Sequence, residues 1–319
     1  MPILGSRGGG SNRGFGFAGL ALLKGSVLVS SGHDVGGTRT MQYMIVEDLS
    51  DFAYFGDIAP SIGDCDNSGS SSSTRGVFFS AGSFAQNNGG GYITMRSTGN
   101  ANFFGYVVAR TGGGGANTGG NSSVGTATST TRSCWAGQTN SSTFPPGTWN
   151  SNIDYVDYAS LGNAVKFGDL TPYGRIVGGA GSPTRGIYWG RFGNVHGPAR
   201  NDIDYITIAS TGNSTSFGDS QNSRGGGACS STTRAIGAQQ TVAGYVTIAS
   251  TGNATTFDTI RGFEGAQQGG SVTVGIFRDG NSAMQKCTIA STGSFTTFGT
   301  TGQDGGGNMA CTNTGGNTV

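Results

Sequence analysis

The chain has 319 residues, of which 62 are glycine and 11% are charged, and its formal net charge is +1. So small a charge gives no reason to expect nucleic acid or an anionic membrane as a partner. A chain this rich in glycine could be a low-complexity linker, but β-branched and aromatic residues recur at fixed places, which argues against disorder.

The first 22 residues lie outside the repeats described below. Residues 15–23 (FGFAGLALL) follow two arginines and loosely imitate a secretory signal, but no small-x-small cleavage site follows. No run reaches the roughly 18 apolar residues that a membrane span needs. We expect this glycine-rich arm to order on a partner protein, with a disordered tail as the alternative. Its expected contact residues are Ile3, Arg7, Arg13, Phe15, Phe17 and Leu20.

Six copies of one phrase follow the arm, each defined by an aromatic residue and a phenylalanine twelve positions later. In the sixth copy a lysine replaces the first aromatic, and the first copy is otherwise degenerate. The copies are spaced by about 40 to 63 residues, a repeat length that indicates a modular fold. They run Tyr43–Phe55, Tyr92–Phe104, Tyr155–Phe167, Tyr205–Phe217, Tyr245–Phe257 and Lys286–Phe298.

The fourth copy shows what one phrase builds. Residues 205–210 alternate with the period of two that is typical of a strand. Residues 211–213 (TGN) tolerate positive φ, which predicts a tight hairpin turn before a second strand at 214–217. One copy is therefore expected to be a β-hairpin.

A second phrase precedes most hairpins, as in TRGIYWG (184–190), and a segment of small residues precedes that, as in GGGACSS (225–231). Each unit then holds four short strands in about 40 to 50 residues, which matches a β-propeller blade of the WD40 or kelch length. Small residues suit the crowded inner strands. The sequence predicts an all-β, six-bladed propeller with four-stranded antiparallel blades; an open β-solenoid or trimeric fibre is the alternative.

The chain ends indicate how the ring closes. The first blade starts at its second strand, near Val27, and a surplus strand of the inner type follows the sixth hairpin at 304–314. Placing that strand in the first blade removes a sheet edge. We therefore divide the chain into an arm, 1–22, and a propeller, 23–319, closed by the C-terminal strand.

The largest break in the repeats is the 63-residue spacing around 138–152, which places Phe144 and Trp149 in a polar loop. Exposed aromatic residues suit stacking on a sugar or docking on a protein, so this loop is the expected receptor or glycan contact. A loop that folds over its own aromatic residues is the alternative. Trp135 and Trp189 lie in second strands, where core packing is expected.

Catalytic and metal-binding motifs are weak. His33 and His196 fall in loop-like contexts without a recognisable nucleophile nearby. The five cysteines form no C-x-x-C pair, and Cys65, Cys229 and Cys311 fit inner-strand positions as small buried residues. We expect no catalytic residues, metal site or cofactor.

Charged residues recur with the repeats. Asp57, Asp169 and Asp219 follow the closing Phe-Gly of their copies, and an arginine opens the second strand in four blades. A residue that recurs in this way is expected to serve the blade, through a turn or an ion pair between blades. The arginines are Arg75, Arg132, Arg185 and Arg234.

Two stretches resemble structural proteins of tailed bacteriophages, notably marine and cyanobacterial ones. They are the repeat TRGIYWG…NDIDYITIASTGNSTSFGD and the leader MPILGSRGGGSNRGFGFAGL. The resemblance implies a virion component of the tail or its fibres, assembled in the host cytoplasm, whose arm docks on other virion proteins. The expected role is host attachment without nucleic-acid binding, membrane insertion or enzymatic activity. A lectin-like propeller, a capsid-surface decoration protein and an enzyme on a propeller scaffold remain as alternatives.

Overall fold

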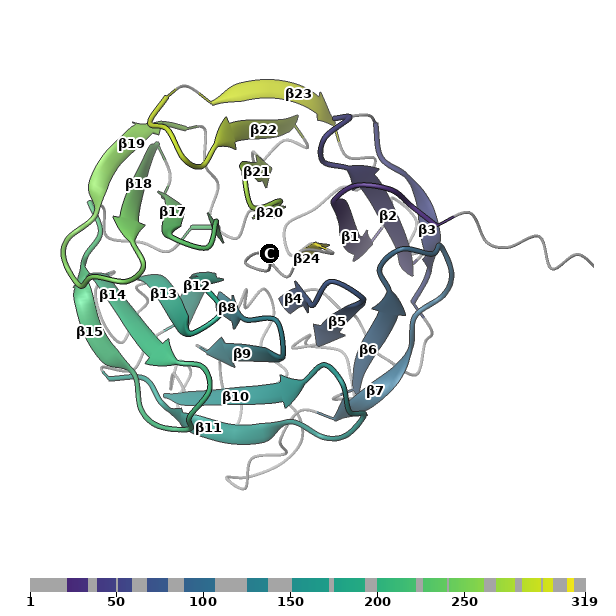
Figure 1. Cartoon of the computed structure of the whole chain (residues 1–319), viewed down its shortest axis with the longest axis horizontal. Coiled ribbons are helices and arrows are strands. Elements are labelled where there is room, and N and C mark those ends of the chain that lie inside the picture. Colours follow the sequence, from purple (N-terminus) through teal and green to yellow (C-terminus); the bar gives the residue numbers. More distant parts are fainter. Residues whose placement is uncertain are drawn as a thin grey trace, which may run out of the picture.

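The computed structural model is a closed ring of six four-stranded antiparallel sheets, a six-bladed β-propeller (Figure 1). The blade number, the strand number and the all-β class agree with the prediction. The structure describes residues 22–33, 39–49, 51–58, 68–79, 89–106, 125–136, 151–171, 175–192, 200–221, 226–239, 241–260, 268–278, 283–293, 295–300 and 309–312.

We name the four strands of each blade by their order from the axis to the rim: inner, second, third and outer. Blade 1 consists of β24 (Met309–Thr312), β1 (Val27–His33), β2 (Arg39–Ile45) and β3 (Ala53–Asp57). Blade 2 consists of β4 (Ser68–Ser71), β5 (Arg75–Phe79), β6 (Gly89–Thr94) and β7 (Asn102–Tyr106). Blade 3 consists of β8 (Gly125–Thr128), β9 (Arg132–Ala136), β10 (Asn152–Asp157) and β11 (Val165–Asp169).

Blades 4 to 6 follow the same order. Blade 4 consists of β12 (Arg175–Gly181), β13 (Arg185–Phe192), β14 (Arg200–Thr207) and β15 (Thr215–Asp219). Blade 5 consists of β16 (Ala228–Ser230), β17 (Arg234–Gln239), β18 (Val242–Thr247) and β19 (Thr255–Thr259). Blade 6 consists of β20 (Gln268–Gly270), β21 (Val274–Arg278), β22 (Ala283–Thr288) and β23 (Thr296–Thr300).

The C-terminal strand closes the ring as predicted. β24 pairs with β1 in an antiparallel register in which Leu28 faces Thr312 and Ser31 faces Met309. Each inner strand also contacts the inner strands of both neighbouring blades, so β24 lies between β20 and β4. Blade 1 therefore joins the two ends of the propeller.

Small residues line the axis because neighbouring backbones approach closely there. A Cβ atom on Gly179 of β12 would lie 2.3 Å from the backbone nitrogen of Thr126 in β8, and one on Gly178 would lie 2.3 Å from the carbonyl oxygen of Gly226. No side chain fits at these distances. The small-residue segments that precede the second strand in blades 4 and 5 thus contain the inner strands β12 and β16, as expected.

The twelve-residue spacing brings two aromatic rings together on the third and outer strands. The Tyr205 and Phe217 rings lie 6.0 Å apart with an interplanar angle of 80°, an edge-to-face contact. The other intact copies repeat this contact at 5.8 to 6.3 Å. The phenylalanine is the extra residue of a β-bulge, since the register shifts at this point in all six blades. The bulge turns its ring into the core between blades.

The TGN segment is not the tight turn that the local pattern predicts. β14 ends at Thr207 and β15 begins at Thr215, so residues 208–214 form a longer loop. This loop reaches the outer strand of the preceding blade: Gly212 N–H donates to Phe167 O (3.0 Å), and Asp169 N–H donates to Asn213 Oδ1 (3.0 Å). Blades 2, 3 and 5 make the same pair of contacts with their predecessors. The motif therefore joins blades.

Candidate functional site

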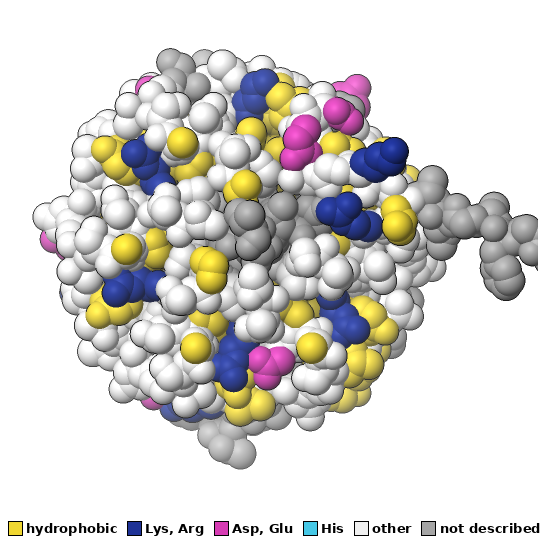
Figure 2. All heavy atoms as spheres, in the orientation of Figure 1, with side chains coloured by type: hydrophobic (Ala, Val, Ile, Leu, Met, Phe, Trp, Pro, Cys, Tyr) yellow, Lys and Arg dark blue, Asp and Glu magenta, His cyan; other side chains and the backbone are white. Residues whose placement is uncertain are grey.

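One face of the ring is built from two kinds of described loop, the turn from inner to second strand and the loop from third to outer strand. We call it the arginine face; it faces the viewer in Figures 1 and 2. A serine shapes each turn: Ser129 Oγ accepts hydrogen bonds from the backbone N–H groups of Thr131 (3.2 Å) and Arg132 (3.1 Å). Ser72, Ser182, Ser231 and Ser271 do the same in their blades. The capped turn fixes where the next residue points.

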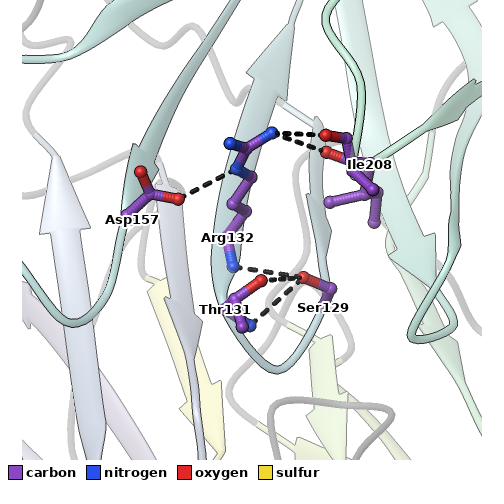
Figure 3. Close-up of polar contacts among 6 residues, drawn as sticks. Ser129, Thr131, Arg132, Asp157 and Ile208 are labelled. Carbon is purple, nitrogen blue, oxygen red and sulfur yellow. Dashed lines mark hydrogen bonds and ion pairs between the residues drawn. The ribbon is translucent and has the colours of Figure 1, made fainter.

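That next residue is the repeated arginine, and it reaches into the following blade. Arg132 Nη1 donates to the carbonyl oxygens of Ile208 and Ala209, both at 3.1 Å (Figure 3). Arg185 and Arg234 bond the equivalent carbonyls at 2.8 to 3.1 Å, and Arg75 does so to Tyr158 O at 2.5 Å. The repeated arginine thus serves the fold, as predicted, but the alternative of an ion pair between blades is wrong for it, because the acceptors in the next blade are main-chain carbonyls. The Arg132–Asp157 ion pair lies within blade 3.

Each of these guanidinium groups also covers a tyrosine ring of its own blade. The Cζ atom of Arg185 lies 4.4 Å from the centroid of Tyr205, and the other three pairs lie at 4.4 to 4.8 Å. A cation at this distance is attracted by the ring quadrupole. The repeated arginine is therefore an inter-blade clamp held flat by its tyrosine.

The two interfaces beside blade 1 lack this clamp. Val27 and Val274 occupy the arginine position in blades 1 and 6, as the strand registers show. Between blades 1 and 2 a backbone group replaces the guanidinium, since Leu23 N–H donates to Arg96 O at 2.8 Å. In blade 6, Lys286 stands in place of the tyrosine. The departures in the first and last copies thus coincide with ring closure.

Cationic side chains ring the arginine face (Figure 2). Besides the four clamps, the face carries Lys24 before β1, Arg96 after β6 and Lys286 in β22. In blades 2 to 6, the described residues of the loops that form this face include no carboxylate, and Asp157 at the end of β10 pairs with Arg132. Blade 1 contributes Glu47, Asp48 and Asp51 from its own loop. The face is therefore electropositive away from blade 1.

The outer strands of blades 1 to 3 carry exposed large hydrophobic side chains at the rim. Tyr54 in β3 is 59% exposed, and Phe103 and Tyr106 in β7 form a ring contact with centroids 5.0 Å apart. Val165 in β11 completes this apolar rim, and Leu22 before β1 and Leu161 in the third-to-outer loop of blade 3 are also exposed. Comparing the six copies would have found it, because Ser216, Thr256 and Thr297 occupy the position of Phe103 in blades 4 to 6.

A buried ion pair in blade 4 was also not predicted from the sequence. Arg191 in β13 bonds Asp204 in β14, and each side chain is at most 2% exposed. Burial raises the pKa of Asp204 to about 6, against the attraction of Arg191. A strongly shifted carboxyl is a candidate for chemistry. At this burial it cannot reach a solute, so we interpret it as part of the blade core.

All eight predicted contact residues lie outside the described residues, namely the six of the arm and Phe144 and Trp149 of the 138–152 loop. His196 and Cys65 lie outside them too. Trp135 and Trp189 are buried in second strands, which confirms core packing. Cys229 is buried in an inner strand as expected, and β24 contains Cys311. Cys134 and Cys287 are also buried thiols, in β9 and β22. Burial raises the pKa of these three thiols.

We expect Arg185→Ala to lower the free energy of unfolding by about 1 to 2 kcal/mol, because it removes a charge-assisted hydrogen bond and a cation–π contact. Arg185→Lys should recover only part of the loss, since an ammonium cannot cover the ring and donate in one plane. Denaturant unfolding measures both. Lys166→Ala, an exposed cation on the rim, is the control; an equal effect there would contradict the clamp.

The fold places the chain among the six-bladed β-propellers whose blades are sequence repeats. No protein-family model matches the sequence, and neither does any curated protein. Among solved structures it is similar to a chain in the crystal structure of a nidogen/laminin complex. That match has 10% identity and a TM-score of 0.59, and covers 90% of this chain and 98% of that chain. At this identity the likeness concerns the fold alone.

No helix among the described residues has the length and hydropathy to span a bilayer. No cluster of three or more His, Cys, Asp or Glu side chains there could hold a metal ion.

Proposed function

We propose that the protein is a bacteriophage virion component, of the tail or its fibres, that presents the propeller for host attachment. The observation that carries the proposal is the resemblance of the leader and of the TRG and TGN repeat phrases to structural proteins of tailed phages. A propeller fold supports many unrelated functions, so the fold adds no weight by itself. Decoration of the capsid surface is the second location for the same role.

The arm is the proposed anchor to other virion proteins. Closure uses β24 and β1, so it needs no residue before Leu22. Leu23 ties the start of the propeller to blade 2 through Arg96 O, and its side chain packs on the core shared by blades 1 and 2. The described chain therefore begins at the junction of blades 1 and 2, whose outer strands carry Tyr54, Phe103 and Tyr106 of the apolar rim. An arm and a flanking apolar surface together suit docking on a protein neighbour.

We expect that removing residues 2–20 leaves a monodisperse propeller whose melting temperature is unchanged, because the described core does not use them. The truncated protein should no longer enter particles. Mass spectrometry of purified virions from a complemented infection measures incorporation, with full-length protein as the reference. Incorporation at the normal copy number would refute the anchoring role.

We further expect the 138–152 loop, with Phe144 and Trp149, to contact the host rather than to hold the ring together. Replacing it with a short Gly-Asn turn should preserve the melting temperature and reduce adsorption of particles to host cells. Circular dichroism and adsorption counts separate the two effects. A misfolded product would mean that the loop is structural.

A lectin-like function is the second candidate, and the apolar rim favours it. Tyr54 and the Phe103–Tyr106 pair are exposed aromatic rings beside Asn102, a combination that suits stacking on sugars. Binding to a glycan array, lost on changing Phe103 to the Ser of blade 4 and Tyr106 to the Thr of blades 5 and 6, would support it. Enzymatic activity would show itself as turnover of host polysaccharide.

A further inference from the structure

The arginine face also carries cations at the blades that have no arginine clamp. In blades 2 to 5 the arginine clamps the next blade, so its charge could be incidental to that contact. Blade 6 has no clamp, because Val274 replaces the arginine, yet Lys286 places an ammonium group on the neighbouring strand of the same face. At the junction of blades 1 and 2, Lys24 and Arg96 are exposed cations without a clamp.

These three side chains therefore have no visible part in joining blades. Lys24 and Arg96 are exposed and Lys286 is half-buried. The Arg96 contact with Leu23 uses the backbone carbonyl and leaves the guanidinium group out of that bond. Together with the clamps they give every sector of the face a cation, which Figure 2 shows as a ring of dark blue side chains. Because Glu47, Asp48 and Asp51 lie in the loop of blade 1, the ring attracts anions chiefly over blades 2 to 6.

The arrangement also restricts the kind of anion. One cation per sector means that a ligand touching several of them must extend across blades, as a polymer does. The tyrosine faces next to the cations are already covered by guanidinium groups, at 4.4 to 4.8 Å. Stacking of bases, on which binding of single-stranded nucleic acid depends, therefore has no platform at these tyrosines. Recognition by charge alone favours a polysaccharide with acidic groups.

We propose that the arginine face binds an anionic polysaccharide, with Lys24, Arg96 and Lys286 as contact residues beside the four clamps. The inference deepens the proposed attachment role by naming the ligand class. Binding of this type is multivalent and weakens as salt screens the charges. The clamps hold their cations in place, so the face is preorganised for a polyanion.

The test uses the full-length protein and dextran sulfate, with neutral dextran and oligo(dT) as comparison polymers, in surface plasmon resonance at several salt concentrations. We expect salt-sensitive binding of dextran sulfate, no binding of neutral dextran and weaker binding of oligo(dT). The combined variant Lys24→Gln, Arg96→Gln and Lys286→Gln should bind dextran sulfate about tenfold more weakly, with an unchanged melting temperature. Lys166→Gln, which removes a rim cation paired with Asp169, should bind normally.

Equal binding by the combined variant and the wild type would overturn the proposal, as would tighter binding of oligo(dT), which would point to nucleic acid. If the combined variant unfolds, the three single variants replace it, and normal binding by all three would have the same meaning. The presence of the protein in virions is measured separately. Binding by a protein absent from particles would refute the virion role and leave the ligand class standing.

Discussion

Deleting residues 303–319 should open the propeller and lower its melting temperature by roughly 5 to 10 °C. The deletion removes β24, the inner strand of blade 1, and with it the antiparallel pairing along residues 28–31. Each lost backbone hydrogen bond costs about 1 kcal/mol, and 1 kcal/mol corresponds to a few degrees in a chain of this size. The inner edge of β1 would also become an unpaired strand edge, which promotes aggregation.

Differential scanning calorimetry and light scattering measure the two effects of this deletion. Deleting residues 315–319 alone, beyond β24, is the matched control and should leave both readouts unchanged. The interfaces beside blade 1 should suffer most, because neither has an arginine clamp. A truncated protein that melts like the full chain would show that β24 does not hold the ring closed.

The fold could be predicted because its signals are local and repeated. The spacing between Tyr205 and Phe217 reports two rings on adjacent strands, and six copies of it give the blade count. The surplus strand at the C-terminus and the missing inner strand before Val27 predicted closure. Each of these inferences needed only a pattern of residue types and the demand that backbone groups be paired.

The contacts between blades could not be predicted in the same way. The composition of TGN suits a tight hairpin turn, but residues 211–213 form hydrogen bonds with the backbone of the preceding blade instead. The partners of Arg132 in the next blade are carbonyl oxygens, which every residue has, so no sequence signal marks them. The Arg191–Asp204 pair depends likewise on a neighbouring strand, since thirteen positions separate the two residues.

Residues that depart from the repeat make contacts that replace the repeated ones. Asp258 replaces the glycine of the Phe-Gly step in blade 5, and its carboxylate accepts from Phe295 N–H at 3.1 Å. Phe295 in turn packs its ring against Phe257 and Phe277. Blade 6 therefore joins blade 5 through a different pair of residues, and Val274 in place of the clamp changes the contact with blade 1. The sequence departs from the repeat where the ring closes.

The glycine that follows the closing phenylalanine in blades 1 to 4 should be one of the least replaceable residues in the chain. A Cβ atom on Gly168 would lie 2.0 Å from the carbonyl oxygen of Gly212 in the next blade, and that oxygen belongs to the TGN loop bonded to Phe167. Both sides of this contact are backbone, so neither can move aside as the end of a flexible side chain could. Gly56 and Gly105 meet the same obstacle in blades 1 and 2, at 2.1 and 2.0 Å.

We therefore expect Gly168→Ala to lower the free energy of unfolding by about 2 to 3 kcal/mol, the cost of overpacking a contact that must separate. Gly212→Ala is the matched control on the other side of the same contact, because a Cβ atom there meets nothing within 4 Å. That change should alter stability by less than about 1 kcal/mol. Denaturant unfolding of the two variants against wild type gives the comparison. If they were equally stable, the close approach between Gly168 and Gly212 would not be what holds blades 3 and 4 in register, and the reason for the Phe-Gly step would have to lie elsewhere.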